Sequence, residues 1–285
     1  MEGILVMFRG VLTDKFNKRR MRSLTAVWLG VFALATPVSA QNSDSVDLAK
    51  KMSNPISSLI SVPFQYNSNS GYGPNEGTQN YVNIQPVIPF SLNDDWNVIS
   101  RTILPVISNN GNMPGGSAFG LGDTVQSVFF SPKAPTSGGL IWGAGPVFLL
   151  PTATEESLGT GKWGAGVTAV ALKQSGAWTV GGLGNHIWSV AGDSDRADVN
   201  STFLQPFVSY TTKKATSFSL NTESTYDWET EQWSVPINLM VNQMIKLGKK
   251  QPAQIGLGVR YWAQAPDGGP EGWGLRLNFA LLYPK

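Results

Sequence analysis

The chain has 285 residues, of which 14% are charged, with 21 Lys and Arg against 19 Asp and Glu for a formal net charge of +2. So small a net charge gives no reason to expect nucleic acid as a partner. The absence of cysteine excludes disulfides, thiol catalysis and cysteine metal sites together. A chain poor in charge, near neutral in mean hydropathy and rich in Gly and Trp is typical of strands that show one face to lipid and the other to a polar lumen.

The N-terminus has the three parts of a secretory signal peptide. A basic run, Lys18–Arg22, precedes an apolar stretch, Leu24–Leu34, that is too short to span a bilayer. Val38-Ser39-Ala40 then resembles a cleavage site, so we expect cleavage after Ala40. Residues 1–20 would be an upstream start-site extension if translation begins at Met21. The alternative interpretation of the segment is a short membrane anchor or a buried helix.

After Ala40 no apolar run approaches the ~20 residues that a spanning helix needs. Apolar and polar residues instead alternate with period two in about twelve segments, each near the ~9–11 residues of a tilted membrane-crossing strand. We therefore predict a periplasmic N-terminal segment over residues 41–56 and an antiparallel outer-membrane β-barrel over residues 57–285. The expected strands are 57–67, 80–90, 96–107, 119–131, 139–151, 162–173, 177–189, 200–212, 216–227, 232–246, 252–265 and 272–284.

The last segment carries the strongest of these patterns. From Trp273 to Tyr283, every second residue is apolar or aromatic, while Gly274, Arg276 and Asn278 lie on the other face. A strand that closes a barrel must pair with the first strand and present such a continuous face to lipid. The pattern therefore indicates that the C-terminus completes the barrel.

The connections between segments alternate in length, as they do in outer-membrane barrels with long extracellular loops and short periplasmic turns. Tryptophans also gather near segment ends, where interfacial girdles are expected. Prolines inside the segments argue the other way, because each removes a hydrogen bond from the ladder, although a bulge could accommodate it. A soluble periplasmic β-sandwich is the alternative fold. The prolines concerned are Pro63, Pro86, Pro105, Pro146, Pro206 and Pro236.

Several short runs resemble one bacterial family along nearly the whole predicted mature chain. The family is a group of outer-membrane barrels labelled transporter or MetA-pathway of phenol degradation protein, some of which carry the name neuromedin U. The resemblance implies a Gram-negative outer-membrane barrel and suggests hydrophobic or aromatic solutes, but brings no site residues with it. The matching runs include Gln85-Pro86-Val87-Ile88-Pro89-Phe90, Ser100-Arg101-Thr102-Ile103-Leu104-Pro105, Gly120-Leu121-Gly122-Asp123, Leu150-Pro151-Thr152-Ala153-Thr154, Leu158-Gly159-Thr160-Gly161-Lys162-Trp163, Leu204-Gln205-Pro206-Phe207 and Trp233-Ser234-Val235-Pro236.

Four charged residues fall on the polar faces of the predicted strands: Arg101, Glu223, Arg260 and Arg276. They should point into the lumen, because a charge on the lipid face costs about 2–4 kcal/mol at the membrane midplane. One hypothesis is an eyelet that favours anionic or aromatic-carboxylate solutes. The alternative is a structural plug, in which Glu223 pairs with one or more arginines and large side chains fill the lumen.

His186 is the only histidine and stands in Asn185-His186-Ile187-Trp188-Ser189. A lipid hydrolase would need a hydroxyl within hydrogen-bond reach of this imidazole. Ser189 is three residues away, on the opposite face of a strand, so it cannot serve His186 locally. We therefore interpret His186 as a strand residue and predict no enzymatic activity.

The run Gly192–Asp198 holds three carboxylates in one predicted outer loop, and Glu155-Glu156 lies in another. Oxygen ligands suit calcium, but no EF-hand pattern is present and Arg196 lies inside the run. Solvated acidic loops are the favoured interpretation, with no metal and no cofactor. The expected partners are outer-membrane lipid, lipopolysaccharide and small solutes.

The sequence thus predicts a barrel for passive or facilitated passage of small solutes. A closed structural or adhesive barrel whose outer loops bind a partner is the second hypothesis, and a barrel lipid hydrolase is the third. The pattern leaves open whether residues 43–55 plug the lumen and whether the barrel is oligomeric.

Overall fold

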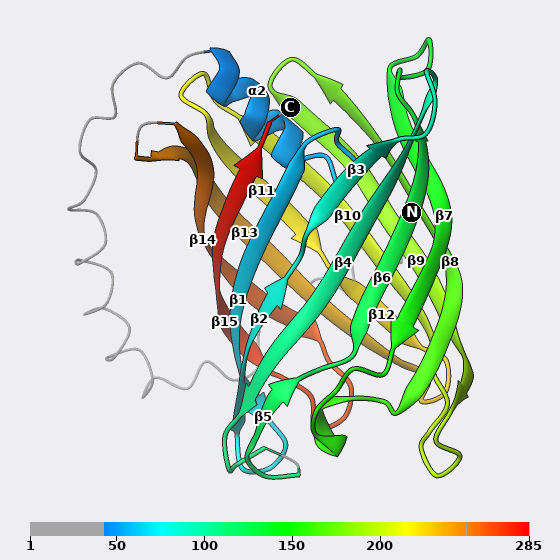
Figure 1. The fold of residues 1–285 in the computed structure, drawn as a ribbon. Helices are drawn as coiled ribbons and strands as arrows, with labels where there is room; N and C mark the ends of the chain where they lie inside the picture. Colours follow the sequence, from blue (N-terminus) through cyan, green and yellow to red (C-terminus); the bar gives the residue numbers. More distant parts are fainter. Residues whose placement is uncertain (1–42, 114, 249, 285) are drawn as a thin grey trace, which may run out of the picture. The chain divides into compact units, whose positions relative to one another are not determined.

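A computed structural model describes residues 43–113, 115–248 and 250–284. These residues form a closed barrel of twelve antiparallel strands (Figure 1), so the predicted fold class is confirmed. The last strand pairs with the first from Ile60↔Tyr283 to Ser68↔Leu275, as the pattern from Trp273 to Tyr283 predicts. The predicted signal peptide, residues 1–40, lies outside the described residues. No helix in the described part of the chain is both long enough and apolar enough to cross a membrane.

Nine of the twelve strands that the described residues form are continuous, and three are interrupted. The continuous strands are β1 (Ile60–Tyr72), β4 (Trp96–Asn109), β7 (Leu140–Leu150), β8 (Lys162–Ser175), β9 (Trp178–Gly192), β10 (Asn200–Thr211), β13 (Gln232–Leu247), β14 (Gln251–Gln264) and β15 (Gly272–Tyr283). The interrupted ones are β2 (Gly77–Ile84) with β3 (Val87–Ser91), β5 (Ala118–Leu121) with β6 (Thr124–Pro132), and β11 (Thr216–Thr222) with β12 (Ser224–Asp227).

The interruptions explain how the barrel tolerates its internal prolines. Pro86 itself lies in the gap between β2 and β3, where the amide of Gln85 instead donates to the carbonyl of Pro63 (2.8 Å). Pro206 on β10 and Pro236 on β13 stand on either side of Glu223, the single residue between β11 and β12. Proline lacks an amide hydrogen, so a ladder that skips these positions loses little. The prolines therefore mark local gaps in the wall and leave the barrel closed.

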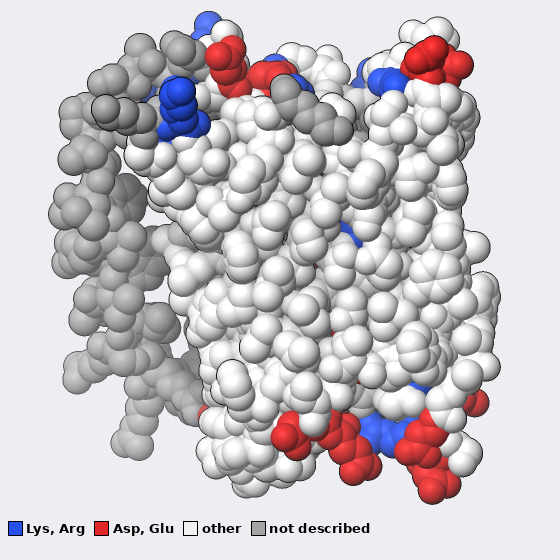
Figure 2. Space-filling model, viewed as in Figure 1, with Lys and Arg blue, Asp and Glu red and all other residues white. Residues whose placement is uncertain are grey.

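The outer surface is an apolar belt with charged ends. In Figure 2 the wall between the two ends is almost free of charged side chains, which gather at the rims. Aromatic pairs lie near both rims: Trp96–Trp142 and Trp178–Tyr210 toward the end that carries the end of β15, Tyr226–Trp228 and Tyr261–Trp273 toward the long loops. Only helices and closed barrels satisfy their backbone in lipid. The belt is thus a membrane-spanning surface, and the chain is a Gram-negative outer-membrane protein.

The barrel interior is divided into two unlike halves. On one side, which we call the packed half, inward side chains form hydrophobic clusters as in a soluble core. On the other side, which we call the hollow half, the inward residues of β10, β11, β13, β14, β15 and β1 include many Ser, Asn and Gln side chains together with Arg260 and Arg276. The packed half comprises Ile99, Phe129, Val147, Leu149, Val170, Leu172, Leu183 and Ile187.

Helix α2 (Ser43–Met52) docks into the barrel end that carries the C-terminus (Figure 1). Its Ala49 is fully buried in a cluster with Met244 and Leu282, which point inward from β13 and β15. Gln174 Nε2 donates to the carbonyl of Lys50 (3.0 Å), and Ser53 Oγ donates to Ser209 Oγ (3.2 Å). The segment that the sequence left open as plug or mobile tail is therefore an ordered cover on this mouth of the lumen.

Candidate functional site in the barrel lumen

All four charged residues predicted for the lumen point into it, but only three of them meet. Glu223, in the gap between β11 and β12, binds both Arg260 of β14 and Arg276 of β15. We call these three residues the latch. Arg101 of β4 lines the same lumen but makes no hydrogen bond or ion pair with any residue that the structure describes. The predicted set therefore separates into a paired group and a lone cation.

The latch is held by short, charge-assisted hydrogen bonds. Arg276 grips Glu223 with both terminal nitrogens, Nη1 to Oε1 at 2.8 Å and Nη2 to Oε2 at 2.7 Å. Arg260 Nη2 donates to the same Oε2 at 2.6 Å. Such planar bidentate pairs fix both geometry and direction. Both arginine side chains are 2% exposed and that of Glu223 is 21% exposed, so the latch is largely buried in the lumen.

A second ring of polar residues holds the two arginines in place. Arg260 donates from Nε to Asn238 Oδ1 and from Nη1 to Tyr81 Oη, each at 2.7 Å. Arg276 Nε donates to Asn67 Oδ1, also at 2.7 Å. Tyr81 stands on β2, far around the wall from Glu223, so the network ties separate parts of the wall across the lumen. Sequence reasoning missed Tyr81, Asn67 and Asn238, because alternation shows which residues face inward and not which of them touch.

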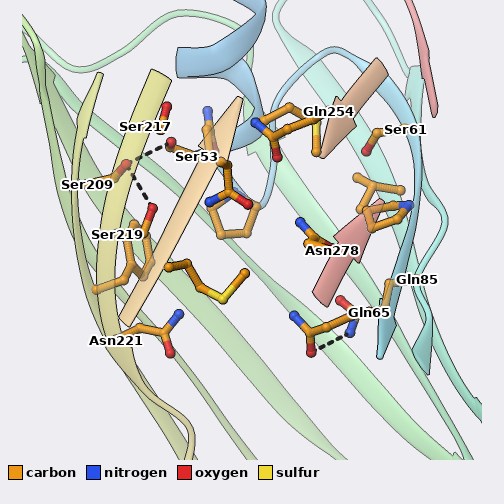
Figure 3. A pocket seen from close by; sticks show the side chains of 18 of the residues that line it. Ser53, Ser61, Gln65, Gln85, Ser209, Ser217, Ser219, Asn221, Gln254 and Asn278 are labelled. Atoms are coloured by element: carbon orange, nitrogen blue, oxygen red, sulfur yellow. Dashed lines mark hydrogen bonds between the residues drawn. The ribbon is translucent and has the colours of Figure 1, made fainter. Parts of the chain in front are cut away.

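Between α2 and the latch lies a cavity of about 210 Å³, which we call the chamber. Residues 51–55 and Ser57 bound it toward the covered mouth, and Arg276 bounds it toward the latch. Figure 3 shows two facing groups of polar side chains around it. The hydroxyl bank comprises Ser53, Ser209, Ser217 and Ser219, and the amide bank comprises Gln65, Gln85, Gln254 and Asn278.

Part of this lining is hydrogen-bonded within itself and part is not. Ser209 Oγ accepts from both Ser53 Oγ (3.2 Å) and Ser219 Oγ (3.1 Å), which links the hydroxyl bank. The Oδ1 atoms of Asn242 and Asn278, in contrast, are buried and have no hydrogen-bond partner among the described residues. An unsatisfied buried acceptor costs about 1–3 kcal/mol, and such groups in native proteins often mark functional positions.

The charge balance around the chamber is positive. Arg101, Arg260 and Arg276 contribute three positive charges and Glu223 one negative charge, which leaves two in excess. Since Glu223 neutralises part of the latch, Arg101 is the guanidinium with donors to spare. The residues around the chamber therefore carry an excess of positive charge, and Arg101 is the arginine among them that the latch does not bind.

A larger cavity of about 440 Å³ lies at the loop end, on the other side of the latch along the strands. Thr225 and Asp227 of β12 and Ser234 of β13 line it together with the loop residues 159–160 and 196–200. Glu223 precedes these β12 residues in the same interrupted strand. The latch thus stands between two polar spaces, one near each mouth.

His186 faces lipid, on the outer surface of β9. Its Nδ1 lies 2.7 Å from Thr202 Oγ1, which also accepts from Trp228 Nε1 at 2.9 Å, and its ring contacts Trp188 at 4.0 Å between centroids. Ser189 bonds instead to Asp198 and to the amide of Val199. The expectation that Ser189 cannot serve His186 agrees with this geometry, although a threonine hydroxyl that the sequence did not single out is within reach.

The acidic loops are more structured than solvated loops would be. Arg196 pairs with Glu156 at 3.1 Å and so joins two loops, while Lys162 pairs with Asp198 at 3.0 Å. The hydrogen bond from Lys162 holds the pKa of Asp198 below its usual value. Asp123 accepts from the amide and hydroxyl of Thr160, at 2.6 and 2.7 Å. Within the described residues, no group of three or more His, Asp or Glu side chains could hold a metal ion.

Comparison with known proteins adds to this picture at the level of the fold. No protein-family model matches the chain, and no curated protein matches it. Among solved structures, it is similar to an outer membrane channel from Pseudomonas putida F1, with 19% identity over 79% of this chain and 94% of that chain and a TM-score of 0.60. The chain shares the outer-membrane barrel fold of that protein.

Looser likenesses include the outer membrane phospholipase A from Escherichia coli, with 9% identity, coverage of 79% and 90% and a TM-score of 0.47. Another is the KdgM porin in complex with disordered oligogalacturonate, with 10% identity, coverage of 79% and 99% and a TM-score of 0.40. Neither supports a conclusion about the chemistry of this lumen.

Proposed function

We propose that the barrel is an outer-membrane channel for small solutes, without cofactor or energy source. The observation that carries this proposal is the hollow half of the lumen, where polar groups surround a cavity next to Arg101, which has no ion-pair partner in the described part of the chain. A barrel with a purely structural role has no need of this space, since the packed half of the same lumen is filled with hydrophobic side chains. The latch and helix α2 would then act as the constrictions that a solute must pass.

The solute is proposed to be anionic, because the excess charge at the chamber is positive and lies in a low-dielectric lumen. The family resemblance by itself suggests hydrophobic or aromatic solutes. We also propose that residues 1–40 form a signal peptide and that the chain is a member of the family that it resembles.

The test is single-channel conductance of the folded protein in planar bilayers, with Arg101, Arg260 and Arg276 changed singly to Ala. Arg101→Ala should lower the anion-to-cation permeability ratio, since it removes the free cation without disturbing the latch. Lys173→Ala is the matched control, because it removes the same charge from an exposed side chain of β8. Unchanged conductance and selectivity in all three arginine variants would refute the eyelet.

A second candidate is a closed structural or adhesive barrel whose outer loops bind a partner. The observation in its favour is that the latch and α2 both cross the lumen. Bilayers should then show no current from the wild-type protein or from Glu223→Gln, in which the latch is weakened. Current from either protein would exclude this candidate.

The third candidate, a lipid hydrolase, draws on the contact between Thr202 and His186 on the lipid-facing surface. No carboxylate among the described residues is bonded to this imidazole, and Thr202 already accepts from Trp228. We expect no release of fatty acid from phospholipid vesicles. Release that disappears in His186→Ala would establish the hydrolase and refute the channel as the sole function.

A further inference from the structure

We propose that the chamber is a binding site for a small polyhydroxylated carboxylate, with its carboxylate on Arg101 and its hydroxyls between the two polar banks. The inference rests on the proposed channel function and names the class of solute that the channel carries. It departs from the hydrophobic or aromatic solutes suggested by the family resemblance, because the groups that line the chamber are of a different kind.

The carboxylate of the solute is assigned to Arg101 because the other two arginines of the lumen are bound within the latch. The terminal nitrogens of Arg276 are bound to Glu223 and its Nε to Asn67, so each of its three nitrogens already donates one hydrogen bond within the protein. Arg260 is likewise bound by Asn238, Tyr81 and Glu223. Arg101 has no such partner among the described residues and lines the chamber. A guanidinium offers a planar pair of donors that matches a carboxylate.

No carboxylate of the protein competes for this position. Glu223 is taken up by the latch, and none of the residues that line the chamber is acidic. The cationic residues on the lining are Lys51, Arg101 and Arg276, of which Lys51 pairs with Asp47 on the outer side of α2. An anion that enters the chamber therefore meets cationic side chains and no carboxylate on the lining itself.

The remainder of the lining suits hydroxyl groups. Serine hydroxyls and carboxamides each offer both a donor and an acceptor, as the hydroxyls of a polyol do. The two banks face each other across the cavity, so a solute between them can bond on both sides (Figure 3). Phe207 is the one aromatic residue on the lining, which leaves no sandwich of rings for an aromatic solute.

The amide bank continues around the wall toward Arg101. Asn242 and Asn278 stand on either side of Gly256 in the strand register, and Asn278 is opposite Gln65. Gln85 Nε2 then donates to Gln65 Oε1 at 3.5 Å, and Gln85 sits two residues before Val87, the partner of Arg101. Gly256 leaves room for Asn242 here, since a Cβ at this position would lie 2.1 Å from Asn242 Oδ1 and the amide would have to move.

Two buried acceptors near the amide bank that lack a hydrogen-bond partner among the described residues are the second indication of a ligand. Asn242 Oδ1 and Asn278 Oδ1 are buried with no partner in the described structure, and both residues line the chamber. A solute carboxylate cannot donate to them, but a solute hydroxyl can, directly or after rotation of the amide. The combination of a free cation and unfilled acceptors therefore calls for a molecule with both groups. The volume of 210 Å³ lies below the ~300–1,000 Å³ of pockets for drug-sized ligands, so the molecule is small.

The experiment is titration calorimetry of the folded barrel in detergent micelles with four test solutes. D-gluconate has both groups, sorbitol is its uncharged analogue, hexanoate has the same chain length without hydroxyls, and benzoate is an aromatic carboxylate. We expect gluconate to bind at least tenfold more tightly than each of the others. Arg101→Gln should weaken gluconate at least tenfold, and Asn278→Ala should weaken gluconate several-fold while leaving hexanoate unchanged.

Lys173→Gln is the control for charge, and heat-modifiable gel mobility checks that each variant is folded. If hexanoate or benzoate bound as tightly as gluconate, the proposal that the hydroxyl and amide banks bind the hydroxyls of the solute would be overturned. Gluconate binding unaffected by Arg101→Gln in a folded protein would overturn the carboxylate position.

Conductance measured on the same preparations separates the inference from the proposed function. Current without binding of gluconate at millimolar concentration would overturn this site and leave the channel intact. Gluconate binding that depends on Arg101, in a protein that passes no current, would support the site and overturn the channel.

Discussion

The packed and hollow halves of the lumen are both formed by strands with a two-residue alternation. Their inward side chains nevertheless differ, because those of the packed half are hydrophobic and many of those of the hollow half are polar. In the packed half, Ile99, Phe129 and Leu172 are almost completely buried in one hydrophobic cluster. In the hollow half, buried positions of the same kind hold Asn67, Asn238 and Ser217. The first arrangement resembles the core of a soluble protein, and the second leaves a cavity and a charged latch.

This difference shows that one barrel wall can combine a hydrophobic core with a polar cavity. A closed barrel needs only its outer belt to be apolar, so the inward face is free to differ from strand to strand. Packing β6, β8 and β9 against one another inside the lumen supplies dispersion contacts that a water-filled barrel lacks. The polar groups are then concentrated on the remaining strands, where they can be shared with a solute.

Among the variants that compare the two halves, Phe129→Ala in the packed half should have the largest effect on stability. The ring of Phe129 is fully buried, so its removal should lower the free energy of unfolding by about 3–5 kcal/mol. Urea unfolding of the protein in lipid vesicles, followed by tryptophan fluorescence, measures this loss.

Ser219→Ala is the matched variant in the hollow half, where one hydroxyl bond to Ser209 is lost. Its cost should stay within about 0.5–1.5 kcal/mol. Equal losses for the two variants would mean that the halves contribute alike to stability, and the comparison would fail.

The next effect is expected from Glu223→Gln. The amide keeps some hydrogen bonds but leaves two buried arginines without a counter-charge, so stability should fall by about 1.5–3 kcal/mol. Conductance should rise, because the two guanidinium groups then repel each other and the latch loosens. A variant that is destabilised but shows unchanged current would place the limiting constriction elsewhere, at α2.

Ala49→Leu tests that second constriction. Ala49 is fully buried between α2 and the wall, and the larger side chain should weaken docking of the helix by about 1–3 kcal/mol. We expect more frequent openings in single-channel records, with little change in overall unfolding. Asp44→Leu places the same side chain on an exposed position of the helix and should leave the records as in the wild type.

The smallest effect concerns the loops, outside both halves. The hydrogen bond from Lys162 depresses the pKa of Asp198, so this carboxylate stabilises the folded loop above its ordinary pKa and the contribution is lost as the pH falls through the depressed value. Hydrogen exchange of residues 193–199 should therefore accelerate as the pH falls below about 4 once corrected for the intrinsic rate. In Asp198→Asn this added acceleration should be absent, and its persistence would assign the effect to another group.

Much of the fold could be predicted because a strand shows its two faces in a two-residue period. The alternation from Trp273 to Tyr283 predicts the closing strand, and the inward placement of Arg101, Glu223, Arg260 and Arg276 follows from the same rule. The prolines inside the predicted strands argued against the barrel. The gaps at Gln85-Pro86 and Glu223 that accommodate them involve three neighbouring strands at once, so the alternation within one strand does not predict them.

The sequence alone determined the barrel, the number of its strands and which residues face inward, since these depend on local alternation and turns. Which inward residues meet was decided only by closure of the barrel. Tyr81 and Arg260 are 179 residues apart in the chain and become hydrogen-bonded partners, while Arg101 has no hydrogen-bond partner among the residues that the structure describes. Such pairings depend on strand register, wall gaps and the docking of α2 together, and no local pattern records them.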